Sequence, residues 1–139
     1  MARKGVKNIQ STKTEIDGIK FASKFEASRY QELKLMEVAR EIFHLRCHVS
    51  FPLQNDQIAI RELRGDKIRT YTPDFIYVVK RDEPGPDGEN YQRVAEETKG
   101  IMTGAASLRL SCFKAFYPDI DLRVIKQRPR KKYTRKKKT

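Results

Sequence analysis

Two strand-like segments joined by a strong turn signal constrain the fold of this chain more than any other feature. The first, Ile68–Lys80, ends in an apolar run rich in β-branched residues, and the second is Tyr91–Lys99. Between them lies Pro84–Gly88, with the turn-forming sequence Pro-Gly-Pro-Asp-Gly. We therefore predict that these segments form adjacent antiparallel strands in the core of a sheet.

The remaining segments predict a mixed α/β domain. Ser23 and Glu26 have the spacing of a capping box, which favours a helix beginning there. The other expected elements are a helix over 23–43, a strand over 44–54, a helix over 103–117 and a strand over 119–125. The predicted order is therefore αβββαβ, a mixed sheet with a helix on each side. The apolar faces expected to be buried are Phe25, Leu33, Leu35, Met36, Ala39, Ile42 and Phe43 in the first helix, and Ala105, Leu108, Cys112 and Ala115 in the second.

The charge of the chain is concentrated at its two ends. Of the formal net charge of +12, Lys126–Thr139 contributes +9 and Met1–Lys13 contributes +4, which leaves −1 for the rest. Basic arms of this kind typically neutralise phosphates, so a nucleic acid is the expected partner. A solubilising tail is the alternative. We predict a basic arm over 1–20, a folded core over 21–125 and a tail over 126–139 that is disordered until a partner binds.

Size and composition exclude several classes of protein. At 139 residues the chain is expected to be one domain. No apolar run is long enough to span a membrane, and the start of the chain lacks an apolar signal-peptide core. Cys47 and Cys112 are its two cysteines, which argues against a disulfide scaffold and favours a reducing cytoplasm.

Asp74, Glu97 and Lys99 are the residues that point most directly to chemistry. Asp74 follows Pro73, which suggests a bend in the strand that could turn the carboxylate toward its neighbour. Strand alternation places Glu97 and Lys99 on one face and Glu96 on the other. Two carboxylates can bind a divalent cation through oxygen, and a lysine can neutralise charge on a phosphate. This trio therefore predicts metal-assisted cleavage of a phosphodiester.

Four motifs together resemble the PD-(D/E)xK nuclease superfamily. They are Ser-x-x-Glu at 23–26, Tyr-Thr-Pro-Asp-Phe at 71–75, Glu-Thr-Lys-Gly at 97–100 and Tyr-Pro-Asp-Ile-Asp-Leu-Arg-Val at 117–124. Within that superfamily the chain resembles a family of small phage-encoded nucleases over 21–125, and its motifs are similar to those of Holliday-junction resolvases of the phage endonuclease I type. The resemblance implies a restriction-endonuclease-like core. The connection between Asp74 and Glu97 is longer here than in the resolvase.

The resemblance also implies roles for individual residues. Asp74 and Glu97 would bind Mg²⁺ or Mn²⁺ with help from the backbone carbonyl of Thr98. Lys99 would act on the attacking water, and Glu26 would complete or orient the metal site. A capping-box glutamate needs no such role, so a purely structural Glu26 is the alternative.

Basic residues outside this trio are candidates for contacts to a DNA backbone, although exposed charges are often only solvated. The candidates are Arg109 and Lys114 on the second helix, the weaker Lys20, Lys24 and Arg29 near the first, and Arg128, Arg130, Lys131, Lys132 and Arg135 in the tail. A zinc site at His44, Cys47 and His48 is not expected. A regular strand would put Cys47 on the opposite face, and the chain has no further Cys–His pair to complete four ligands.

The leading hypothesis is a metal-dependent DNA endonuclease acting on branched DNA in phage replication or recombination, in the cytoplasm of the bacterial host. Resolution of a four-way junction requires two coordinated cuts, which would imply a homodimer. Nicking or trimming of DNA during packaging is a second enzymatic hypothesis. A non-catalytic nucleic-acid-binding protein is the alternative of another class.

Overall fold

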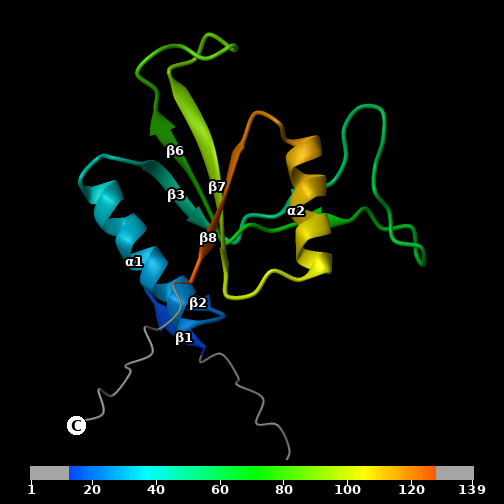
Figure 1. The fold of residues 1–139 in the computed structure, drawn as a ribbon, viewed down its shortest axis with the longest axis horizontal. Coiled ribbons are helices and arrows are strands. Elements are labelled where there is room, and N and C mark those ends of the chain that lie inside the picture. The colour runs from blue at the N-terminus through cyan, green and yellow to red at the C-terminus, as the bar shows by residue number, and fades with distance from the viewer. Residues whose placement is uncertain (1–12, 128–139) are drawn as a thin grey trace, which may run out of the picture.

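A mixed four-stranded sheet lies between two helices (Figure 1). The computed structural model describes residues 13–127. The strand order is β3-β6-β7-β8, with β7 and β8 parallel and the other neighbours antiparallel. The elements are β1 (Thr14–Ile16), β2 (Ile19–Phe21), α1 (Lys24–Val38), β3 (Phe43–Cys47), β4 (Phe51–Pro52), β5 (Thr70–Tyr71), β6 (Phe75–Lys80), β7 (Tyr91–Lys99), α2 (Gly104–Phe116) and β8 (Asp121–Lys126).

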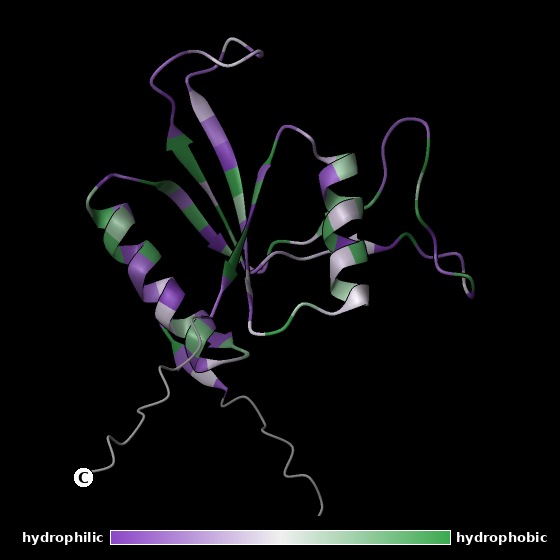
Figure 2. Cartoon of the chain, in the orientation of Figure 1, coloured by the Kyte–Doolittle hydropathy of each residue, from purple (hydrophilic) through white to green (hydrophobic). Residues whose placement is uncertain are grey.

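The central strand β7 separates two hydrophobic clusters. Val94 belongs to the cluster formed with Tyr30 and Leu33 of α1. The next residue, Ala95, belongs to the cluster formed with Leu110 and Phe113 of α2. Successive side chains of a strand point to opposite faces, so each helix covers its own face of the sheet. Figure 2 shows apolar residues along β6 and on both helices.

The predicted central hairpin is confirmed. Strands β6 and β7 pair in register from Phe75 opposite Glu96 to Lys80 opposite Tyr91. Strand β7 has the bounds expected from the sequence. The order αβββαβ also holds for the four-stranded sheet and its two helices, with small additional strands at β1, β2, β4 and β5.

The first helix is shorter than predicted and buries only part of the predicted face, including Leu33. Ile42, which lies after the helix, is also buried as predicted. The helix ends at Val38 rather than Phe43, and Arg40 takes a positive φ of 59°. The buried residues include Ala27, Tyr30 and Leu33, whereas Leu35 is 72% exposed. Leu35 lies two positions after Leu33, about 200° around the helix, so the two cannot face the same sheet.

The second helix buries a different face. Leu110 and Phe113 are its buried residues, whereas Leu108 of the predicted face is 66% exposed. Leu110 and Phe113 are three positions apart and therefore lie on one side of the helix. Phe113 contacts the rings of Phe51 and Tyr71, which determines which side of α2 packs inward.

Two of the predicted strands are each broken into two. The expected strand over 44–54 becomes β3 and β4, separated at His48, where φ is +55°. The expected strand Ile68–Lys80 becomes β5 and β6, separated by Thr72–Asp74. Strands β4 and β5 pair with each other in a small sheet of their own. His48, just after β3, and Asp74, just before β6, therefore lie outside the regular strands of the main sheet.

Part of the predicted basic arm belongs to the folded structure, since β1 and β2 lie almost entirely within residues 1–20. Strands β1 and β2 form an antiparallel hairpin, with Asp17 and Gly18 at its turn. Both turn residues have positive φ, 53° and 75°, as a two-residue turn of this kind requires. The predicted boundary at residue 20 therefore cuts through this hairpin. The predicted tail begins within β8 at Lys126, and residues 128–139 lie outside those that the structure describes.

A buried ion pair fixes α1 to the sheet. Glu96 is fully buried, and both of its carboxylate oxygens accept hydrogen bonds from Arg29, at 2.7 and 2.8 Å. The Tyr77 hydroxyl donates to the same carboxylate. Hydrogen bonding to Glu96 raises the pKa of Arg29, and burial raises the pKa of Tyr77, so both remain protonated donors. Arg29 is thus a structural residue, which corrects its prediction as a contact to DNA.

Replacing Arg29 by leucine is expected to lower the free energy of unfolding by about 3–5 kcal/mol, because it leaves the Glu96 carboxylate buried without its partner. Equilibrium unfolding in urea measures this change. The double variant Arg29→Leu with Glu96→Gln is expected to recover most of the loss.

Lys34→Ala in the same helix is the matched control, because Lys34 forms a 3.0 Å pair with Glu37 at the surface. Its effect is expected to stay below about 1 kcal/mol. An equal loss in both single variants would contradict the role assigned to the buried pair.

Candidate active site

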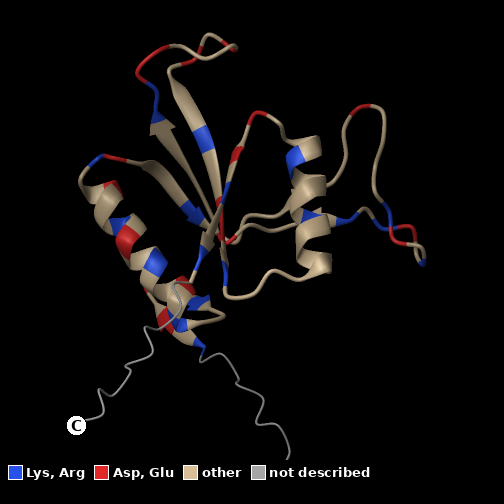
Figure 3. Cartoon of the chain, viewed as in Figure 1, with Lys and Arg blue, Asp and Glu red and all other residues tan. Residues whose placement is uncertain are grey.

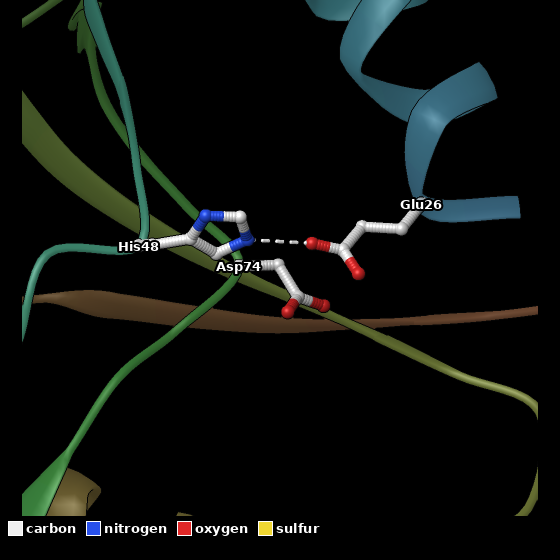
Figure 4. Close-up of side chains that lie close together, drawn as sticks. All are labelled: Glu26, His48 and Asp74. Carbon is white, nitrogen blue, oxygen red and sulfur yellow. Dashed lines mark hydrogen bonds and ion pairs between the residues drawn. The ribbon is translucent and has the colours of Figure 1, made fainter. Parts of the chain in front are cut away.

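Glu26, His48 and Asp74 bring two carboxylates and an imidazole together where β6 begins. One ligand atom from each lies within 4.8 Å of the other two. Figure 4 shows the three side chains pointing toward one another, from α1, from the end of β3 and from the start of β6. Glu26 is buried, Asp74 is half-buried and His48 is exposed, so the group opens to solvent on one side.

The start of α1 positions Glu26. Ser23 is the N-cap, and its hydroxyl accepts a hydrogen bond from the Glu26 N–H at 3.1 Å. Glu26 Oε2 accepts from the backbone N–H of Ala22 at 3.2 Å. Its other oxygen, Oε1, lies 2.8 Å from His48 Nε2. The capping role and a role in the site are therefore compatible, since they use different oxygens of one carboxylate.

The left-handed backbone of His48 directs its ring into the site. With φ at +55°, the residue ends the regular alternation of β3. Its backbone N–H donates to the carbonyl of Asp74 at 3.2 Å, which secures this conformation. The ring lies 5.9 Å from that of Phe21 at the end of the N-terminal hairpin. This break also explains why the sequence does not place His48 beside Glu26, because a regular strand would group it with His44.

Thr98 holds the Asp74 side chain. Asp74 Oδ2 accepts two hydrogen bonds from this residue, at 2.7 Å from the backbone N–H and 2.6 Å from the hydroxyl. The side chain of Asp74 thus extends the pairing of β6 with β7 beyond its last backbone partners. The bend predicted after Pro73 is present, and it turns the carboxylate toward β7 as expected.

The environment of Asp74 disfavours its ionised form. Burial raises the pKa of its carboxyl group, the Thr98 hydrogen bonds oppose this shift, and the nearby charge of Glu26 adds to it. Two carboxylates close together with limited solvent favour the arrival of positive charge. A divalent cation or a proton would supply it.

Glu97 and Lys99 form a pair on the other face of β7. Lys99 Nζ lies 2.9 Å from Glu97 Oε1, and the Tyr71 hydroxyl donates to Glu97 Oε2 at 2.8 Å. Burial, followed by the charge of Glu97, raises the pKa of Tyr71, so this hydroxyl keeps its proton and remains a donor. Tyr71 is a contributor that the sequence reasoning missed, although it stands inside the Tyr-Thr-Pro-Asp-Phe motif.

The structure therefore arranges the predicted residues as two adjoining groups. Glu26 and Asp74 lie together with His48, and Glu97 lies with Lys99. Among the described residues, the group able to hold a metal does not include Glu97. Thr98 joins the two groups, because it follows Glu97 in β7 and binds Asp74 through its N–H and hydroxyl. Glu96 points to the α1 face, as the alternation predicts.

The described candidates for contacts to DNA lie on several different elements, and Figure 3 shows Lys and Arg along the sheet and on both helices. Arg109 is exposed on α2 and lines a pocket together with Lys99. Lys114 is exposed in the last turn of α2, and Lys24 is exposed at the first residue of α1. Lys20 is exposed on β2. Arg128, Arg130, Lys131, Lys132 and Arg135 lie outside the described residues.

The chain belongs to the family described as "Protein of unknown function (DUF1064)", whose family model matches residues 6–135. Comparison with curated proteins and with solved structures gave no match. Neither helix in the described part of the chain has the length and apolar character needed to cross a membrane.

Asp74→Asn is expected to raise the melting temperature by a few degrees at neutral pH in EDTA. The pKa of Asp74 is raised in the folded state, so its ionised form destabilises the fold above that pKa. As the pH falls below the pKa values of both the folded and unfolded states, the carboxyl group becomes neutral in each, and the gain should disappear. Thermal unfolding across a pH series measures it.

Asp119→Asn is the control with the opposite sign. The Arg93 side chain lowers the pKa of Asp119 by a hydrogen bond, so its ionised form stabilises the fold at neutral pH. This variant should therefore gain no stability there. A gain at Asp119 as large as that at Asp74 would contradict the electrostatic explanation.

Proposed function

We propose that this protein is a metal-dependent endonuclease that hydrolyses phosphodiester bonds in DNA. The observation that carries the proposal is the convergence of Glu26, His48 and Asp74 within 4.8 Å, beside the Lys99–Glu97 pair. Carboxylates that can hold a divalent cation next to a fixed ammonium group suit a reaction in which negative charge increases on a phosphate.

The donor set fits a divalent cation. Carboxylate oxygens suit Mg²⁺ and Mn²⁺, and the imidazole of His48 is a ligand typical of transition metals. Mn²⁺ therefore matches all three donors, with Mg²⁺ as the alternative that the carboxylates accept. When bound, such a cation would polarise a phosphate oxygen and lower the pKa of a water ligand.

The other groups of the site supply charge and orientation. Lys99 is a compact positive charge, held at 2.9 Å from Glu97, that can neutralise a phosphate or orient water. The Tyr71 hydroxyl holds the second oxygen of Glu97, which fixes the carboxylate that positions Lys99. We assign Glu97 to this positioning role, and the resemblance implies that it would also bind the metal.

The fold supports the same proposal. A four-stranded mixed sheet with the order αβββαβ is compatible with a restriction-endonuclease-like core. By resemblance to junction resolvases, we propose branched DNA as the substrate and a homodimer as the form that makes two coordinated cuts. The basic segments at both ends of the sequence would add affinity that is independent of base sequence and sensitive to salt.

The purified protein is expected to cut supercoiled plasmid and a synthetic four-way junction with Mn²⁺ or Mg²⁺ and not with EDTA. Asp74→Ala and Lys99→Ala should each reduce the cleavage rate by about 10²–10³-fold, the range for loss of a group that stabilises a transition state. Gel electrophoresis of time courses measures both rates.

Glu32→Ala and Lys34→Ala are matched controls, because each removes a charge from the exposed part of α1. They should leave the rate unchanged. Cleavage that persists in Asp74→Ala would remove the site assigned here. DNA binding without any cleavage would favour the non-catalytic nucleic-acid-binding protein instead.

His48→Asn is expected to weaken Mn²⁺ binding by about 10–100-fold or more, which electron paramagnetic resonance titration can measure without DNA. Asparagine tolerates the left-handed backbone at this position, so the fold should persist.

His44→Asn is the matched control for this measurement. His44 has the same positive φ of 55° and is likewise exposed, but it lies outside the group of potential ligands. Equal loss of Mn²⁺ binding in both variants, or none in His48→Asn, would contradict a ligand role for His48.

A further inference from the structure

The segment between β4 and β5 forms one wall of a pocket beside the Lys99–Glu97 pair. The pocket has a volume of about 390 Å³, and its other walls come from β7 and α2. The segment folds back on itself, because the N–H of Leu53 bonds to the carbonyl of Arg69 at 2.8 Å, and that of Arg69 bonds to the carbonyl of Ile60 at 2.8 Å. These backbone bonds fix the start of β5 against the core.

Three of the basic side chains that line this pocket are exposed and form no ion pair among the described residues. They are Lys67 and Arg69 from the segment and Arg109 from α2. Glu62 and Glu97 are the carboxylates of the pocket, and Glu97 is already paired with Lys99. The residues that line the pocket thus carry more positive than negative charge, around a volume that is open to solvent.

The pocket is connected to the metal-binding group by a short stretch of chain. Arg69, Tyr71 and Thr72 line the pocket, and the chain continues through Pro73 to Asp74. Five residues of extended chain span at most about 17 Å. Successive nucleotides of one strand rise about 3.4 Å along the axis of a duplex. A strand cut at Asp74 can therefore place a phosphate only a few nucleotides away in the pocket.

We propose that this pocket binds a backbone phosphate of the DNA strand that is cut, through Lys67, Arg69 and Arg109. The segment between β4 and β5 is then a DNA-binding element that sets the strand in the active site. The inference rests on the proposed function for the identity of its ligand, because the pocket adjoins the residues assigned to hydrolysis. Arginine and lysine are the side chains most used for phosphate contacts, and such contacts fix the position of a strand without reading its bases.

Lys67→Gln with Arg69→Gln tests the proposal by binding alone. Fluorescence anisotropy with a labelled DNA duplex in EDTA, over roughly 50–200 mM salt, gives the Kd and its salt dependence. The double variant is expected to bind about tenfold more weakly at low salt. Its slope of log Kd against log salt should fall by about 0.9 for each phosphate that the protein no longer neutralises. Both side chains are exposed, so the melting temperature should stay unchanged.

Arg64→Gln is the matched control, because Arg64 is exposed in the same segment but does not line the pocket. It is expected to change neither the Kd nor the slope appreciably. An unchanged Kd in the double variant, or an equal loss in Arg64→Gln, would overturn the proposal and leave these charges as solvated surface.

The binding measurement separates this inference from the proposed hydrolysis. Suppose that the unaltered protein leaves the plasmid intact with Mn²⁺, while the double variant binds DNA more weakly and with a smaller salt slope. This result would contradict the proposed hydrolysis and support the phosphate pocket. Suppose instead that the unaltered protein cuts the plasmid, while the double variant binds DNA as tightly as the unaltered protein does. This result would contradict the phosphate pocket and support the proposed hydrolysis.

Discussion

The candidate active site depends on the hydrogen bonds that hold Asp74 from two sides. Its carboxylate accepts two hydrogen bonds from Thr98 of β7, and its carbonyl accepts one from the N–H of His48 after β3. One residue thus joins the ends of three strands at the point where their regular pairing stops. Because Pro73 cannot donate to a sheet, the chain leaves β-pairing just before Asp74, which frees the aspartate to make these bonds.

Glu96 and Glu97 are adjacent in β7, and their carboxylates point to opposite faces of the sheet. Glu96 faces α1, where it forms an ion pair with Arg29 and accepts a hydrogen bond from the Tyr77 hydroxyl. These contacts fix the helix that carries Glu26 to the sheet. Glu97 faces α2 and binds Lys99 and Tyr71. Period-two alternation explains how two adjacent glutamates can hold a helix on one face and belong to the proposed active site on the other. The ion pair inside the protein therefore bears on the candidate active site through the position of α1.

Local signals predicted part of this fold and part of the site. The turn at Pro84–Gly88 and the alternation of β7 were enough to pair β6 with β7 and to separate the two glutamates. The role of His48 could not be read from the sequence, because its left-handed backbone depends on a tertiary bond to Asp74. The helix faces were partly misassigned because apolar spacing does not specify which side a neighbour covers. The Asp17–Gly18 turn was missed because residues 1–20 were assigned to a basic arm, although this dipeptide is a strong hairpin signal.

The small β4–β5 sheet has an evolutionary consequence. Phe51 pairs with Tyr71 and Pro52 with Thr70, so the chain leaves and re-enters the domain at neighbouring points outside the four-stranded sheet. Insertions or deletions between those points would leave the register of the main sheet intact, and the entropy of closing a loop rises only slowly with its length. This segment can therefore change in length and charge among related chains without changing the four-stranded sheet that carries the candidate site.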